Sequence, residues 1–190
     1  MPLRELSADS SADTLTIAWE LPASPETVWA HLQNIETMSE WLGRPLTFDS
    51  RVGGEIIIDH DDSYLCRSEV LAVDGHSAEL TWSFPDEPTS RVAVSVTAEL
   101  PPTDRGRAPR DAEASTAEVG AAEANTSAAD APSVLVLRHA GLGDLIDSYR
   151  TGWIAHLSFF EASLAGTPLP SSQFWPLCAT VDRLLERGDG

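Results

Sequence analysis

The stretch DLIDSYRTGWIAHLSFFEASLAG, residues 144–166, decides the fold of this 190-residue chain. Large apolar side chains recur in it at every third or fourth position, the spacing of one helix face; they are Leu145, Tyr149, Trp153, Leu157, Phe160 and Leu164. Asp144 suits the N-cap position and Gly166 a helix end. The pattern predicts a helix of about twenty residues, whose apolar stripe has to be buried against another layer of structure.

The residues before that helix predict the layer that buries it. In RVAVSVTAEL, residues 91–100, apolar and polar side chains alternate, as in a half-buried strand. VLVLRHA, residues 134–140, predicts its partner strand. Between them, residues 101–132 contain no aromatic side chain and are rich in Ala, Glu, Thr, Ser and Asp. Such a composition predicts a disordered insertion in an expanded hairpin loop.

The N-terminal half predicts further strands and short helices. Residues 14–20 alternate as a strand, and Ser24 and Pro25 fit the N-cap and first position of a helix. Gly53-Gly54 precedes a strand expected at 55–59, and turn signals at 61–63 and at Asp74-Gly75 separate it from strands expected at 64–73 and 78–84. Residues 1–13 are expected to be disordered, and 167–190 to form a C-terminal extension with a short amphipathic helix.

Strands gathered between helices in this way predict an α+β fold in which helices cover one face of an antiparallel sheet. The long C-terminal helix is expected to pack against the concave face of that sheet. We expect a cavity between the curved sheet and the helix, because concave, apolar spaces lined by aromatic rings are common small-molecule sites.

Composition excludes several classes of function. The formal net charge is −18, and all 12 basic residues are Arg, so lysine-dependent Schiff-base and P-loop chemistry is excluded. An acidic surface predicts no binding to nucleic acid or anionic membranes. The separated cysteines Cys66 and Cys178 predict reduced, structural thiols, and the N-terminus lacks a signal-peptide pattern. We expect a cytoplasmic protein.

Several segments together resemble a known family. They are SPETVWAHL (24–32), MSEWLG (38–43), RVGGEIII (51–58), the hairpin that carries Trp82, and GWIAHLSFFEASL (152–164). In this order they resemble the SRPBCC (START/Bet v 1-like) superfamily, and within it the activator of Hsp90 ATPase homologue 1-like group. The resemblance covers residues 14–166 apart from the insertion. It implies a helix-grip fold, with a curved antiparallel sheet wrapped around the last long helix.

The same resemblance, with the helix stripe, implies a site for a hydrophobic small molecule or lipid under that helix. The expected contacts are aromatic walls and polar anchors, since aromatic rings offer large apolar area with defined geometry; they are Trp41, Arg67, Trp82, Arg138, Tyr149, Trp153, His156 and Phe160. Arg67 and Arg138 are the expected holders of an anionic head group. Arg138 and His139 should face opposite sides of their strand, with one of them pointing into the cavity.

The sequence predicts no cofactor, metal or catalytic residue. Gly141-Leu142-Gly143 lacks the third glycine of a dinucleotide fingerprint. Asp59-His60-Asp61-Asp62 is interpreted as a solvated acidic turn, and Ser158 and Ser163 have no His or Asp partner at a suitable spacing.

The favoured function is therefore ligand binding without catalysis, by a monomer or homodimer. Two alternatives stay open. One is a chaperone-linked or stress-linked protein-interaction module. The other is an enzyme of the cyclase or dehydratase type, which would need acid and base groups that face the cavity.

Overall fold

The computed structural model describes residues 2–9, 13–60, 63–98 and 131–188. Most of the insertion predicted at 101–132 lies outside these residues. The described strands form one antiparallel sheet in the order β1-β2-β8-β7-β6-β5-β4-β3. They are β1 (Leu3–Asp9), β2 (Thr14–Leu21), β3 (Arg44–Phe48), β4 (Glu55–Asp59), β5 (Leu65–Asp74), β6 (Ser77–Trp82), β7 (Ser90–Ala98) and β8 (Ser133–Ala140).

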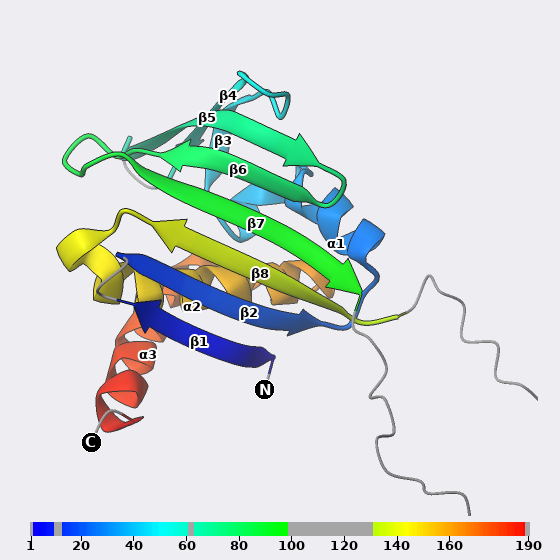
Figure 1. Cartoon of the computed structure of the whole chain (residues 1–190). Coiled ribbons are helices and arrows are strands. Elements are labelled where there is room, and N and C mark those ends of the chain that lie inside the picture. The colour runs from blue at the N-terminus through cyan, green and yellow to red at the C-terminus, as the bar shows by residue number, and fades with distance from the viewer. Residues whose placement is uncertain (1, 10–12, 61–62, 99–130, 189–190) are drawn as a thin grey trace, which may run out of the picture.

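The helices lie on one face of this curved, open sheet (Figure 1). They are α1 (Pro25–Leu32), α2 (Ile146–Leu164) and α3 (Phe174–Gly188). Among the described residues, short 3-10 turns cover Met38–Glu40, Gly143–Leu145 and Ser171–Gln173. The long helix α2 runs behind β2 and β8 in the view of Figure 1. The architecture is the α+β helix-grip arrangement predicted from the sequence.

The register at the sheet centre explains why one face is apolar. In β8, Leu135 pairs with Trp19 of β2 and with Val96 of β7, and Leu137 pairs with Ile17 and Val94. Because side chains of directly paired residues share a face, these rows form one apolar surface toward α2. Leu135 and Ile17 are fully buried.

Both edge strands differ from the sequence expectation. Residues 3–9, predicted to be disordered, form β1 along β2, and Arg44–Phe48 forms β3 along β4. Most β1 side chains are exposed, so its amino acids carry little alternation. Pro45 lies in β3, where an edge position tolerates its missing N–H. Backbone pairing to a neighbouring strand, rather than a side-chain pattern, places these two strands.

The helix ends give one confirmation and one correction. Ser24 caps α1 as predicted, because its Oγ accepts a hydrogen bond from the Thr27 backbone N–H at 3.3 Å. Asp144 does not cap α2: it lies inside the 3-10 turn, and Leu145 occupies the N-cap without a side-chain bond. The extension after α2 forms α3 from Phe174, so that Pro176 lies in its first turn.

Candidate functional site

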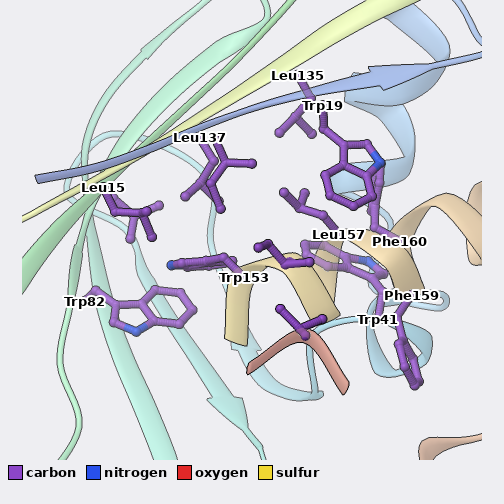
Figure 2. Close-up of a cluster of buried hydrophobic side chains, with 14 of the residues drawn as sticks. Leu15, Trp19, Trp41, Trp82, Leu135, Leu137, Trp153, Leu157, Phe159 and Phe160 are labelled. Atoms are coloured by element: carbon purple, nitrogen blue, oxygen red, sulfur yellow. The ribbon is translucent and has the colours of Figure 1, made fainter. Parts of the chain in front are cut away.

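The space between the sheet and α2 is an aromatic interior. Figure 2 shows side chains from the strands pointing toward the helix, with Trp82 close to Trp153 and Trp41 close to Phe160. The Trp82 and Trp153 ring centroids are 5.1 Å apart, and those of Trp41 and Phe160 are 5.0 Å apart in an edge-to-face arrangement. Such pairs pack favourably beyond the area they bury.

The structure brings six of the predicted ligand-binding residues into this interior and its edge. Four of them are buried, with exposed fractions of 8% or less, namely Trp41, Trp82, Trp153 and Phe160. Tyr149 and His156 are partly buried at its edge. We use the name aromatic interior for these six residues together with His60 and His139.

The two predicted arginines lie on the opposite face of the sheet, so the expectation that they anchor a ligand inside is wrong. The Arg67 side chain is 58% exposed and lies 3.6 Å from Glu55. Arg138 is exposed, whereas His139 next to it is fully buried. Successive strand residues face opposite sides, so the inward positions of Cys66 and His139 turn these arginines outward.

Two hollows among the described residues lie at the surface. One, of about 440 Å³, is lined by residues of α1 and by Asn34, and the other, of about 460 Å³, lies over β4, β5 and β6 and includes Arg67. Between the sheet and α2, aromatic side chains pack against one another.

His139 connects three strands and α2 through a defined chain of hydrogen bonds. The indole Nε1–H of Trp153 donates to His139 Nδ1 at 2.9 Å, and His139 Nε2 lies 2.7 Å from Ser90 Oγ. An indole N–H can only donate, so Nδ1 carries no proton and Nε2–H donates to Ser90. Ser90 Oγ in turn donates to the Trp82 carbonyl at 3.2 Å. Burial lowers the pKa of His139 to about 3, which keeps the ring neutral.

His60 also belongs to the interior, which corrects its interpretation as part of a solvated turn. Its ring centroid lies 5.1 Å from that of Phe84 and 5.8 Å from that of His156. Burial, reinforced by repulsion from His156, lowers its pKa to about 3. No periodicity in the sequence signals this position, because His60 follows the last residue of β4.

His156 is fixed by a backbone carbonyl. Its Nδ1 lies 2.7 Å from the carbonyl oxygen of Trp41, which can only accept, so Nδ1 carries the proton. Burial lowers the pKa of His156 to about 4. The neutral ring therefore presents Nε2 as an acceptor.

Three buried polar atoms of the aromatic interior have no hydrogen-bond partner: Trp41 Nε1, Trp82 Nε1 and His60 Nε2. The Trp82 indole lies close enough to the Tyr149 hydroxyl to lower the pKa of Tyr149, although the two groups form no hydrogen bond of normal geometry. Burying a donor without an acceptor is costly. These atoms are the part of the interior that its own packing does not satisfy.

The Tyr149 hydroxyl donates to Glu87, which lies in the loop between β6 and β7. Burial and the neighbouring Glu87 carboxylate raise the pKa of Tyr149 well above its usual range. Burial also raises the pKa of Cys66 to about 11, so this thiol is protonated and a poor nucleophile. Both cysteines are free and buried, as expected for structural thiols.

A polar link outside the aromatic interior joins α1, the Met38–Glu40 turn and α2. Ser163 Oγ donates to Glu40 at 2.6 Å and lies 2.8 Å from His31 Nε2. Since the hydroxyl proton goes to Glu40, His31 Nε2–H donates to Ser163. Sequence spacing does not reveal these partners, which are 123 and 132 residues away. Ser163 lies between His31 and Glu40 and donates its hydroxyl hydrogen bond to the Glu40 carboxylate rather than to the histidine. The arrangement is therefore not that of a hydrolase triad.

The helix α3 covers the edge of the aromatic interior. The Phe174 ring centroid lies 4.6 Å from that of His156, at a tilted angle, and 5.7 Å from that of Phe159, edge-to-face. Thr151 of α2 donates to Asp182 of α3, and Val181 is buried. Trp175 is 71% exposed, and its ring meets that of Phe174 edge-to-face at 5.3 Å.

Within the described ranges, no three His, Cys, Asp or Glu side chains are grouped as metal ligands. None of the helices that the structure describes is long and apolar enough to cross a lipid bilayer.

Comparison with solved structures finds the same fold in several proteins. CalU16 from Micromonospora echinospora is 15% identical, with 97% of this chain and 96% of that chain covered and a TM-score of 0.65. A Bordetella parapertussis protein is 21% identical, with 92% and 85% covered and a TM-score of 0.59. DynU16, from the dynemicin biosynthetic locus, is 18% identical with a TM-score of 0.58; 82% of this chain is covered and 49% of DynU16, so the match spans about half of that protein.

No curated protein sequence matches the chain. The family model of the activator of Hsp90 ATPase homolog 1-like proteins matches residues 22–130, more than half of the chain. This family match, together with the shared helix-grip fold, shows that the chain belongs to the activator of Hsp90 ATPase homolog 1-like family of the SRPBCC superfamily.

Proposed function

We propose that this protein binds a small, largely apolar molecule in the aromatic interior and does not transform it. The observation that carries the proposal is the convergence of Trp41, Trp82, Trp153 and Phe160 on one space under α2. Aromatic rings around a few polar atoms are the usual composition of a small-molecule site. A structural relative from a biosynthetic locus supports a small-molecule ligand rather than a polymer.

Because aromatic rings pack against one another in this interior, a ligand has to move some of them as it enters. We place the entry under α3, where Phe174 is only partly buried against His156. The strands are held by continuous ladders, whereas α3 rests on a small apolar face and the Thr151–Asp182 hydrogen bond. Elements with few buried contacts open at low free-energy cost.

A binding role fits the histidines better than catalysis does. His139 uses both ring nitrogens in buried hydrogen bonds, so a proton transfer through either would break one of them. His156 keeps Nε2 free, but its pKa, lowered by burial to about 4, makes this nitrogen a weak base at neutral pH. We therefore favour binding over the cyclase or dehydratase alternative.

The test combines thermal unfolding with tryptophan fluorescence across a panel of lipids and aromatic metabolites. A ligand present at 100 times its Kd stabilises the folded state by about 2.7 kcal/mol, which raises Tm by several degrees in a chain of this size. Native mass spectrometry of the freshly purified protein should detect a bound molecule. The proposal fails if no compound in the panel changes either Tm or fluorescence.

Entry under α3 has its own test. Phe174→Ala should speed the association of a bound compound, measured by stopped-flow fluorescence. Trp175→Ala is the matched control, because Trp175 is the next residue and is 71% exposed. Equal association rates in the two variants would place the entry elsewhere.

A further inference from the structure

The two indole groups without partners carry an inference about the chemistry of the ligand. Trp19 and Trp153 are as deeply buried as Trp41 and Trp82, with exposed fractions between 4% and 8% for all four. Trp19 Nε1 donates to Glu161 at 3.2 Å, and Trp153 Nε1 donates to His139 at 2.9 Å. Trp41 Nε1 and Trp82 Nε1 have no acceptor. The fold therefore supplies acceptors for two buried indoles and leaves two unsatisfied within the aromatic interior.

An indole N–H can donate but cannot accept. A group that satisfies Trp41 or Trp82 must therefore offer a lone pair, as a carbonyl, ether or carboxylate oxygen does. A hydrocarbon ligand would leave both donors unpaired and would bury them further. The same space also contains His60 Nε2 without a partner.

The charge of the surroundings selects among these acceptors. Among the described residues no arginine is buried; the least exposed, Arg150, is 19% exposed and paired with Asp147. His60, His139 and His156 are neutral inside the protein. Burying an anion without a counter-charge costs much more than burying a neutral acceptor. A carbonyl fits this interior better than a carboxylate.

We propose that the ligand is an uncharged molecule with a carbonyl oxygen that accepts the indole N–H of Trp41, Trp82 or both. This inference rests on the proposed function, because it names the class of molecule that the same interior binds.

Three probes on one ring system test it: 2-acetylnaphthalene, 2-ethylnaphthalene and 2-naphthoate. They share the naphthalene surface and differ in having a neutral acceptor, no acceptor and a charged acceptor. We expect the ketone to bind roughly tenfold more tightly than the other two, as a buried hydrogen bond predicts. If all three bind equally, the acceptor inference is wrong although the proposed function stands. If none of the three binds while another compound of the panel does, the acceptor inference is likewise wrong and the proposed function stands; if no compound of the panel binds, both fail.

Indole NMR of the unmodified chain gives an independent measurement. With ¹⁵N-labelled tryptophan, the ketone should move the Nε1–H resonance of Trp41 or Trp82 downfield, and the hydrocarbon should not. Trp19 and Trp153, which already have acceptors, serve as internal controls. Unchanged Trp41 and Trp82 resonances, or a bound water that stays on both indoles in the saturated complex, would overturn the proposal.

Variants separate the two donors. Trp41→Phe and Trp82→Phe keep an aromatic ring and remove the N–H. At least one of them should weaken binding of 2-acetylnaphthalene roughly tenfold while changing binding of 2-ethylnaphthalene less than about twofold. Trp175→Phe is the control because Trp175 is 71% exposed. Equal losses for both probes would mean that the rings contribute packing alone.

Discussion

At the scale of single residues, His139 has the most consequential position in the core. It is fully buried, accepts from Trp153 of α2 and donates to Ser90 of β7. Loss of the ring would remove the only acceptor that the structure gives to the Trp153 indole. The cost of such a change is set by the unsatisfied donor as much as by the lost volume.

His139→Phe should lower the free energy of unfolding by about 3 kcal/mol. The phenyl ring fills much of the space, but it can neither accept from Trp153 nor donate to Ser90. Urea unfolding followed by fluorescence measures the change. Arg138→Gln, one residue away on the outer face, should change stability by less than about 0.5 kcal/mol. A similar loss of stability in both variants would contradict a stabilising role for the buried hydrogen bonds of His139.

The alternation of side chains along the strand was sufficient to place His139 on the face of the sheet that packs against α2. Leu135, Leu137 and His139 are two residues apart, so they share a face, and Arg138 lies on the other. The prediction that Arg138 points inward relied on its charge, whereas the alternation along the strand puts it on the outer face. For His60 no such signal exists, because the residue lies beyond the end of β4 and its burial depends on Phe84 and His156.

At the scale of elements, two glycines show how differently a strand turn and a helix use the same residue. An added Cβ at Gly54, before β4, would lie 2.3 Å from the backbone oxygen of Asp49. Only glycine permits that close approach. At Gly152, inside α2, an added Cβ would meet nothing within 4 Å.

Gly152→Ala should therefore stabilise the protein by about 0.5–1 kcal/mol, because alanine loses less backbone entropy in a helix than glycine does. Differential scanning calorimetry should show Tm higher by about 2–4 °C. Gly54→Ala is the opposite case and should lower Tm, since the backbone has to move. A loss of stability in Gly152→Ala would mean that α2 needs a close approach at this position.

Elements with a strong internal pattern were predicted well, and those without one were missed. The stripe of Trp153, Leu157 and Phe160 located α2, and the alternation at 91–100 located β7. The strands β1 and β3 lie at the edges of the sheet, and most of their side chains are at least partly exposed. Their amino acids need no period, because main-chain pairing to β2 and β4 defines them.

At the scale of the whole molecule, an acidic surface of net charge −18 encloses an interior with three neutral histidines. Burial lowers the pKa of His60 and His139 to about 3 and that of His156 to about 4. In the unfolded chain the same rings have a pKa of about 6.5. The unfolded state therefore binds protons below that pH that the folded state does not.

Stability should be complete above about pH 7 and fall as the pH drops through about 6.5 toward 4. Protonation of each of the three rings in the unfolded chain should lower the free energy of unfolding by about 1 kcal/mol between pH 6 and pH 5. Urea unfolding at a series of pH values measures the slope. In His139→Phe, which lacks one of these groups, the slope should be shallower by about a third. A flat profile between pH 7 and pH 5 would show that the rings are protonated in the folded protein.

The sequence by itself determined the α+β class, the long apolar helix and the set of aromatic residues that face it. These follow from periods of two and about 3.6 residues, which are local properties of the chain. Only the tertiary structure decided that Trp82 meets Trp153 under α2, that His60 lies beside His156, and that Ser163 meets His31 and Glu40. The reason is physical: those contacts join residues far apart in the chain, so they depend on how whole elements pack.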